Sequence, residues 1–174
     1  MSDFQLKYSG DEDRAFGLAG MAISMASLDA LDRITEIFLD ADGPMVSFAN
    51  SYYFSWAPSV SPKVVWENLM TNFQLTTSLV MGNVMARSLV RLGREARADV
   101  LNEVRALVRE EGREVCSLDE EEADALFDRV VDHSRRLFHN PRLHPAVSRL
   151  AAVIAVKRRL SVIELAEELE MLRI

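Results

Sequence analysis

Three histidines, His133, His139 and His144, lie close together in the sequence, with Asp128 and Asp132 just before them. Imidazole nitrogens and carboxylate oxygens are common ligands of zinc and other transition metals. On a helix the two aspartates share a face, but His139 falls on a different one, and no His-Glu-x-x-His motif or cysteine partner is present. We therefore predict no metal site and no cofactor, and we interpret the histidines as residues near a helix end.

The single cysteine, Cys116, precedes a predicted helix N-terminus, where the helix dipole favours a thiolate. Glu114 and Asp119 lie nearby and oppose a low thiol pKa, and no histidine is close in sequence. The chain also has no Gly-x-Ser-x-Gly motif, no phosphate-binding loop and no glycine-rich dinucleotide turn. We interpret Cys116 as structural, assign no catalytic residue and favour a protein that is not an enzyme.

Polar residues form a narrow strip along an otherwise apolar segment in the middle of the chain: Thr76, Asn83, Arg87, Arg91 and Arg94. If this strip faces bulk water, the segment is only a scaffold. If its residues are buried together, they mark a site, and Arg87 and Arg91 could hold an anion there, including the anion of an enzyme substrate. The second alternative predicts that Arg87 is buried beside a cleft and does not face solvent.

The densest group of aromatic residues is Tyr52-Tyr53-Phe54-Ser55-Trp56. Such a segment either covers the end of a core or forms a pocket mouth or an interaction patch. There is no Lys or Arg between Arg33 and Lys63, so we do not expect it to bind nucleic acid. Together with the central segment it gives our candidate ligand-binding residues: Tyr52, Tyr53, Trp56, Trp66, Asn83, Arg87 and Arg91.

A long helix from Ser61 to Arg94 positions most of these residues. Ser61-Pro62 is a typical helix start, and no proline follows before Arg94. The first half has one apolar face, whereas the second half is apolar on most sides, which is typical of a buried helix. Either the helix passes from one environment into another, or it bends near residues 76–78 or at Gly82.

The rest of the sequence predicts further helices. Apolar residues at helical spacing extend from Phe16 to Phe38, and many intervening residues before Ser27 are small enough for close helix packing. Residues 45–60 are the least helical and could include short extended pieces at 45–48 and 52–54, or a helical turn interrupted before Pro58. Further helices are predicted over 95–113, from a capping box at 117–120 to about His139, from His144 to about Arg159, and from a second capping box at 161–164. The pattern of the last two segments also fits one continuous helix.

We therefore predict an all-α, single-domain helical bundle of five or six helices around the long central helix, with the aromatic loop at one end. Residues 1–10 would form an N-terminal arm and residues 11–174 the domain. The single cysteine, the acidic N-terminal flank and an apolar run too short to cross a bilayer favour a soluble, cytoplasmic protein without a membrane contact.

Charge is distributed unevenly along the chain, whose net charge is −7. Residues 95–132 contain 13 acidic and 5 basic residues, and residues 133–160 contain 7 basic residues and no acidic one. Such segments could pair within the fold, dock between subunits or bind an anion. We expect self-association, as a homodimer or other homo-oligomer, or binding to a protein partner. The alternative is a helical bundle that binds an apolar or anionic small molecule.

Overall fold

The protein is an all-α helical bundle that also carries a small three-stranded sheet, which confirms the predicted fold class. The computed structural model describes residues 6–40, 45–49 and 62–171. The elements of this part of the chain are α1 (Asp11–Ser27), the 3₁₀ helix η1 (Leu31–Arg33), β1 (Ile34–Phe38), β2 (Val46–Phe48), α3 (Pro62–Met85), the π-helix η2 (Ala86–Arg91), α4 (Ala98–Cys116), α5 (Glu120–His139), α6 (His144–Lys157), β3 (Arg159–Ser161) and α7 (Val162–Met171).

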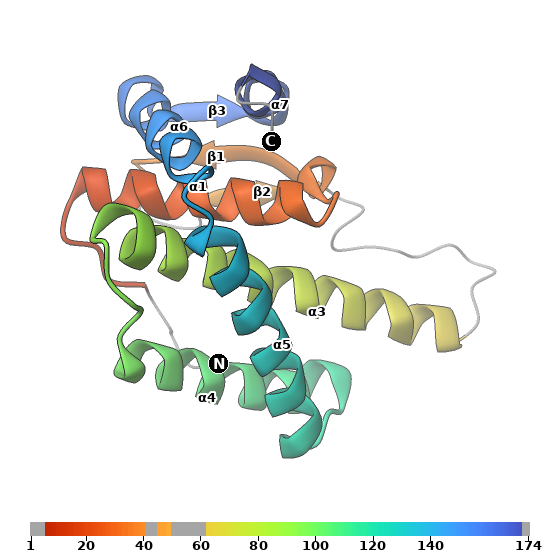
Figure 1. Ribbon diagram of the computed structural model, residues 1–174. Helices are drawn as coiled ribbons and strands as arrows, with labels where there is room; N and C mark the ends of the chain where they lie inside the picture. The colour runs from red at the N-terminus through yellow and green to blue at the C-terminus, as the bar shows by residue number, and fades with distance from the viewer. Residues whose placement is uncertain (1–5, 41–44, 50–61, 172–174) are drawn as a thin grey trace.

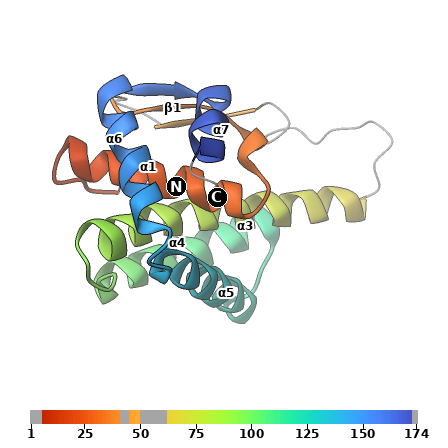
Figure 2. The same cartoon turned by 45° about the horizontal axis from the view of Figure 1, so that its top comes forward.

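The elements are stacked in layers, with α1 in the interior (Figure 1). The sheet, α6 and α7 lie on one side of α1, and α3 lies on the other. The α4–α5 pair covers the side of α3 that faces away from the sheet, as a view from a second direction also shows (Figure 2). The first half of α3 extends beyond this body, whereas its second half lies inside it.

Helix α1 is shorter than predicted. It ends at Ser27, and Asp29 adopts a left-handed conformation with φ of 54°. The apolar pattern continues through Ile34 and Ile37, but these residues belong to β1. The continuation of the helix to Phe38 was therefore wrong. Apolar residues three apart fit a helix, but in this β-branched segment they also fit a strand that is buried against its neighbours on both sides.

The sheet has the order β2-β1-β3, and both pairings are antiparallel. Ile37 in β1 is opposite Val46 on one side and Leu160 on the other, and all three side chains are buried. The extended piece considered at 45–48 is confirmed by β2, and the one considered at 52–54 lies outside the described residues. Strand β3 was not predicted. It occupies three residues between α6 and α7, which is too short to give a sequence pattern of its own.

The long central helix is confirmed: it runs as α3 from Pro62 to Met85 and continues as η2 to Arg91. Its first half is largely exposed and its second half largely buried, in agreement with the predicted change of environment. The hydroxyl groups of Thr77 and Ser78 donate hydrogen bonds to the carbonyl oxygens of Phe73 and Gln74, at 2.9 Å each. These bonds satisfy two polar side chains that are otherwise enclosed in the core.

The helix ends agree with the sequence analysis in one case and differ in another. The capping box at Ser161 and Glu164 is present, since the Glu164 carboxylate accepts from the Ser161 amide at 3.0 Å and the Ser161 hydroxyl accepts from the Glu164 amide at 3.4 Å. The capping box predicted to start at Ser117 is wrong. Ser117 is the left-handed residue that ends α4, and α5 is capped by Asp119 together with Glu122.

Candidate functional site

The polar strip of the central helix lies against the start of the chain. Asn83, Arg87 and Arg91 contact residues 7–13, which comprise the end of the N-terminal arm and the first turn of α1. In Figure 1 the arm, coloured red, runs from α1 toward the green segment that joins η2 to α4. Thr76 lies farther back on the helix and donates to the carbonyl oxygen of Asn72. Asn83 is buried, Arg87 and Arg91 are half-buried and Arg94 is exposed, so the second sequence alternative, that the strip is buried together, holds only in part.

Arg87 and Asp13 form the centre of this site. Arg87 Nε donates to Asp13 Oδ1 at 2.8 Å, and Arg87 Nη2 donates to Asp13 Oδ2 at 2.6 Å. The paired geometry is the strong, bidentate form of an arginine–carboxylate interaction. Asp13 is only 3% exposed, so its charge depends on this partner for compensation. The pair connects α1 to the π-helix at the end of the central helix.

Further contacts fix the N-terminal arm on the central helix. The Arg87 guanidinium lies over the Tyr8 ring, 4.5 Å from its centroid, and Arg87 Nη2 also donates to the carbonyl oxygen of Lys7 at 2.6 Å. The Asn83 amide donates to the Tyr8 hydroxyl oxygen at 2.9 Å. Burial raises the pKa of the Tyr8 phenol above its ordinary value, despite opposing effects from Asn83 and the nearby arginines. Tyr8 is therefore neutral in this site at physiological pH.

Glycines allow α1 and α3 to approach closely enough for these contacts. A Cβ atom on Gly17 would lie 2.4 Å from the Asn83 side-chain nitrogen. A Cβ atom on Gly20 would lie 2.1 Å from the carbonyl oxygen of Gly82, and one on Gly82 would lie 2.1 Å from the Ser24 hydroxyl oxygen. Gly17, Gly20 and Ser24 follow Asp13 at helical spacing. The buried carboxylate therefore lies on the same face of α1 as the small residues predicted to allow close packing.

The environment of Asp13 keeps it ionised. Burial by itself would raise the pKa of this carboxyl group, but the hydrogen bonds from Arg87 and from the Ser9 amide outweigh burial, together with the charges of Arg87 and Arg91. The pKa of Asp13 is consequently below its ordinary value. The site contains a permanent carboxylate whose charge is compensated by arginine.

Arg91 is less completely paired than Arg87. Its two terminal nitrogens lie 3.3 Å from Asp13 Oδ1 and 3.3 Å from Glu12 Oε2. Its Nε atom is buried and has no hydrogen-bond partner within the described residues. Arg91 is the last residue of η2, and π-helical turns occur frequently at functional sites.

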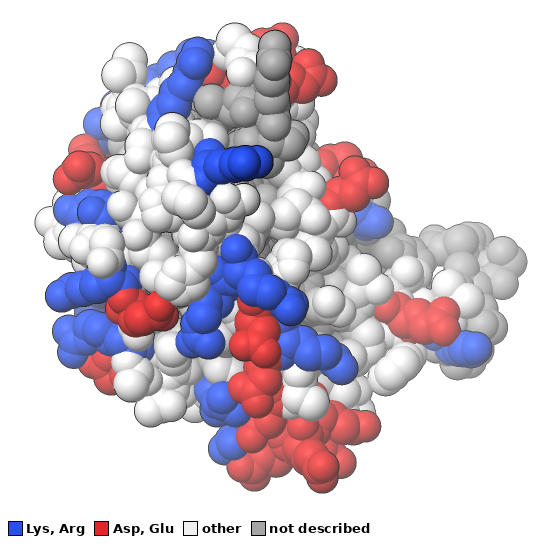
Figure 3. Space-filling view, viewed as in Figure 1, with Lys and Arg blue, Asp and Glu red and all other residues white. Residues whose placement is uncertain are grey.

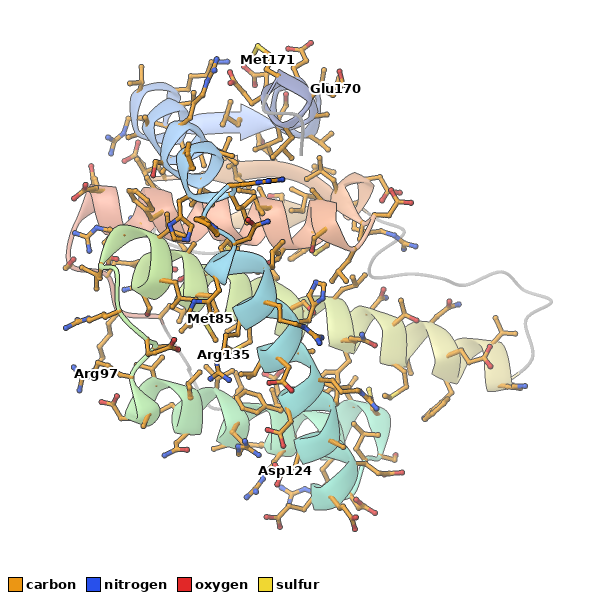
Figure 4. All side chains as sticks on the ribbon, in the orientation of Figure 1. Met85, Arg97, Asp124, Arg135, Glu170 and Met171 are labelled. Carbon is orange, nitrogen blue, oxygen red and sulfur yellow. The ribbon has the colours of Figure 1, made fainter. Side chains whose placement is uncertain are left out.

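A surface cleft of about 390 Å³ opens beside these residues. Its walls come from the N-terminal arm, the end of the central helix and the start of α4. Arg97, labelled in Figure 4, lies at the α4 end of the cleft. Arg87 therefore lies beside a cleft, as predicted, but it is half-buried there and not fully buried. Sequence reasoning missed Lys7, Tyr8 and Asp13; the small-residue face of α1 was a signal for Asp13 only.

Trp66, another predicted site residue, lies away from this cleft. Its indole nitrogen donates to the carbonyl oxygen of Cys116 at 3.3 Å, so that it joins the projecting half of α3 to the end of α4. Trp66 is 50% exposed, Leu69 is 39% exposed and Val115 is 54% exposed. We call these three residues the Trp66 surface. Tyr52, Tyr53 and Trp56 lie outside the described residues.

The three histidines have separate contacts. His133 lies 3.3 Å from the Ser27 hydroxyl, His139 lies 2.8 Å from a Glu95 carboxylate oxygen, and His144 contacts the carbonyl oxygen of Phe138 at 2.8 Å. Within residues 6–40, 45–49 and 62–171, no three His, Cys, Asp or Glu side chains are grouped so that they could hold a metal ion.

Burial raises the pKa of the Cys116 thiol, which disfavours the thiolate that a nucleophile requires. Among the helices of the described chain, none is sufficiently long and apolar to cross a lipid bilayer. Comparisons with models of known protein families and with curated proteins find no match to this chain.

Proposed function

We propose that the protein is a helical interaction domain that self-associates through the Trp66 surface. The observation that carries this proposal is the exposure of Trp66 and Leu69, on the half of α3 that extends beyond the body of the fold, together with Val115 at the adjoining end of α4. Tryptophan is among the residues that contribute most to protein interfaces when it is buried by a partner. The hydrogen bond from Trp66 to the end of α4 holds the indole in place before association.

Acidic side chains adjoin the Trp66 surface. Glu111 is one helical turn before Val115, and Glu110 and Glu114 lie beside it on α4. None of these three carboxylates has an ion-pair partner within the described part of the chain. The pKa of Glu111 is raised, first by burial and then by the charges of Glu110 and Glu114. A cationic group supplied by a partner would relieve this repulsion.

The same chain carries cationic groups that are available for such pairing. Within the segment 133–160, Arg135, Lys157, Arg158 and Arg159 form ion pairs inside the fold. Four exposed arginines form none within the described residues, and they lie on α5, the turn after it and α6: Arg129, Arg136, Arg142 and Arg149. Figure 3 shows basic side chains over the middle of one face and acidic side chains at its lower end. A second copy of the chain therefore offers charge complementary to the acidic residues of α4.

Light scattering over a wide protein concentration range tests this proposal. We expect the wild-type protein to form dimers or larger oligomers, and Trp66→Gln to shift it toward the monomer. Ile163→Gln is the matched control, because Ile163 is 69% exposed on α7 and belongs neither to the Trp66 surface nor to the elements that carry the four arginines. A wild-type protein that stays monomeric at every concentration would refute self-association.

The charge contribution is tested separately. Glu111→Gln should weaken association, and added salt should weaken it further because ions screen contacts between exposed charges. The opposite result, stronger association of Glu111→Gln, would show that the acidic residues of α4 do not face a basic partner surface.

A further inference from the structure

The cleft beside Arg87 differs in charge from the rest of this acidic protein. Five cationic side chains and one carboxylate line it: Lys7, Arg87, Arg91, Arg94, Arg97 and Asp13. The chain as a whole has a net charge of −7. A concave surface that concentrates positive charge attracts anions and holds them by several contacts at once.

The carboxylate of Asp13 compensates the charge of Arg87, which binds both of its oxygens. It does not compensate the charges of all the other cations in the cleft. Two further acids pair with cations of the cleft but do not line it themselves. Glu12 pairs with Arg91 at 3.3 Å, and Asp99 pairs with Arg97. Neither Lys7 nor Arg94 has an ion-pair partner within the described residues. Two positive charges at the cleft are therefore uncompensated.

Donors for an anion come from three separate segments. Lys7 lies on the N-terminal arm, Arg91 at the end of η2 and Arg94 in the loop before α4. The contacts of Arg87 with Asp13, Tyr8 and the Lys7 carbonyl hold the arm against the central helix, so the Lys7 side chain is kept at the cleft. The Arg94 amide also donates to the Ser88 carbonyl oxygen at 3.0 Å, so the backbone that carries Lys7 and Arg94 is held at the cleft before any ligand arrives, which lowers the entropic cost of binding.

We propose that this cleft binds a phosphate group, either free or carried by a small organic molecule. A phosphate carries between one and two negative charges at neutral pH and has several strong acceptor oxygens. Its charge matches the two uncompensated cations, and its oxygens match donors that converge from different directions. Val84 and Val100 also line the cleft and provide apolar contact for the organic part of a phosphate ester.

A second cleft provides an internal comparison. It has a similar volume, about 420 Å³, and lies between α4 and the start of α5. Arg109 and Arg113 line it together with Glu110, Asp119 and Glu120. Because the three acids outnumber the two bases in this second cleft, we expect no anion to bind there.

Isothermal titration calorimetry at neutral pH tests the proposal, with inorganic phosphate, phenyl phosphate and acetate as separate titrants. We expect both phosphates to bind and acetate to bind more weakly. Tighter binding of phenyl phosphate would assign the cleft to a phosphate ester, and equal or weaker binding would assign it to free phosphate.

Two exposed residues supply the variants, so that the fold is preserved. Lys7→Gln and Arg94→Gln should each weaken phosphate binding about tenfold or more, because each removes a charge-assisted hydrogen bond. Arg113→Gln removes the same charge from the second cleft and should bind like the wild type. Circular dichroism checks that each variant is folded. The proposal is overturned if neither phosphate binds, if acetate binds as tightly, or if Arg113→Gln weakens binding as much as Arg94→Gln.

Discussion

Arg87 and Asp13 are joined by two parallel hydrogen bonds of 2.8 and 2.6 Å, although they are 74 positions apart in the sequence. The pair connects the first turn of α1 to the π-helix that ends the central helix. Arg87 also binds the carbonyl oxygen of Lys7 and stacks on Tyr8. One guanidinium group therefore fixes the N-terminal arm, the first helix and one wall of the basic cleft.

Replacing the buried carboxylate should destabilise the protein strongly. We expect Asp13→Asn to lower the free energy of unfolding by about 3 kcal/mol, because it leaves the partly buried Arg87 charge without its partner. Glu12→Gln is the control: Glu12 is adjacent and also pairs with Arg91, but it is exposed, and its loss should cost about 0.5 kcal/mol or less. Urea denaturation measures both values. Equal, small effects would show that the Asp13 pair contributes little to stability.

The same carboxylate should make stability depend on acid. The pKa of Asp13 is lower in the folded protein than in an unfolded chain, so ionised Asp13 stabilises the fold. This contribution is fully present above the unfolded pKa of about 4 and is lost as the pH falls through the lower, folded pKa. We expect the melting temperature of the wild type to fall in this acidic range, and that of Asp13→Asn to fall less. Parallel curves for the two proteins would contradict this assignment.

The close approach of α1 and α3 predicts the effect of adding one methyl group. Gly20→Ala should destabilise the protein by about 2 kcal/mol or more, since its Cβ atom would meet the Gly82 carbonyl oxygen and force the helices apart. Gly112→Ala adds the same methyl group within α4, where its nearest neighbours are side-chain atoms at 3.3 Å. That variant should be nearly neutral by thermal denaturation. A neutral Gly20→Ala variant would mean that the two helices can separate without cost.

Two substitutions at the start of α5 distinguish the observed N-cap, Asp119, from the predicted one, Ser117. Asp119→Ala should cost about 1 kcal/mol, because it removes the side chain that accepts from the Glu122 amide. Ser117→Gly should be neutral or stabilising, since Ser117 occupies a left-handed conformation with φ of 56° that glycine adopts easily. Chemical denaturation of both variants tests this prediction. If Ser117→Gly is the more damaging change, the cap starts where the sequence pattern placed it.

Sequence patterns located most helices because the start and end of a helix depend on residues that are close together in the sequence. Pro62 marks the start of α3, Asn140 follows the end of α5, and the Ser161 capping box precedes α7. The extension of α1 through Ile34 was wrong because the competing structure is a strand paired with the three-residue β2 and with β3, which lies near the other end of the described chain. Short strands that pair over such distances leave little local signal.

The candidate site was predicted only in part, for a similar reason. Arg87 and Arg91 were identified as a polar strip on an apolar helix, which is a local pattern. Asp13 resembled an ordinary acidic residue of a first helical turn, and nothing near Tyr8 marked it as a contact of Asn83. Their roles depend on how α1 crosses α3, which the helical pattern of either segment does not determine.

The proposed self-association is tested most directly by the fluorescence of Trp66. The chain has two tryptophans, so Trp56→Phe leaves Trp66 as the only one. Its indole is half-exposed in the single chain and would be buried by a second copy. We expect its emission to lie at shorter wavelengths in concentrated protein and to shift to longer wavelengths on dilution, at the concentrations where light scattering detects dissociation. An emission maximum that remains at the exposed position at every concentration would contradict the proposal.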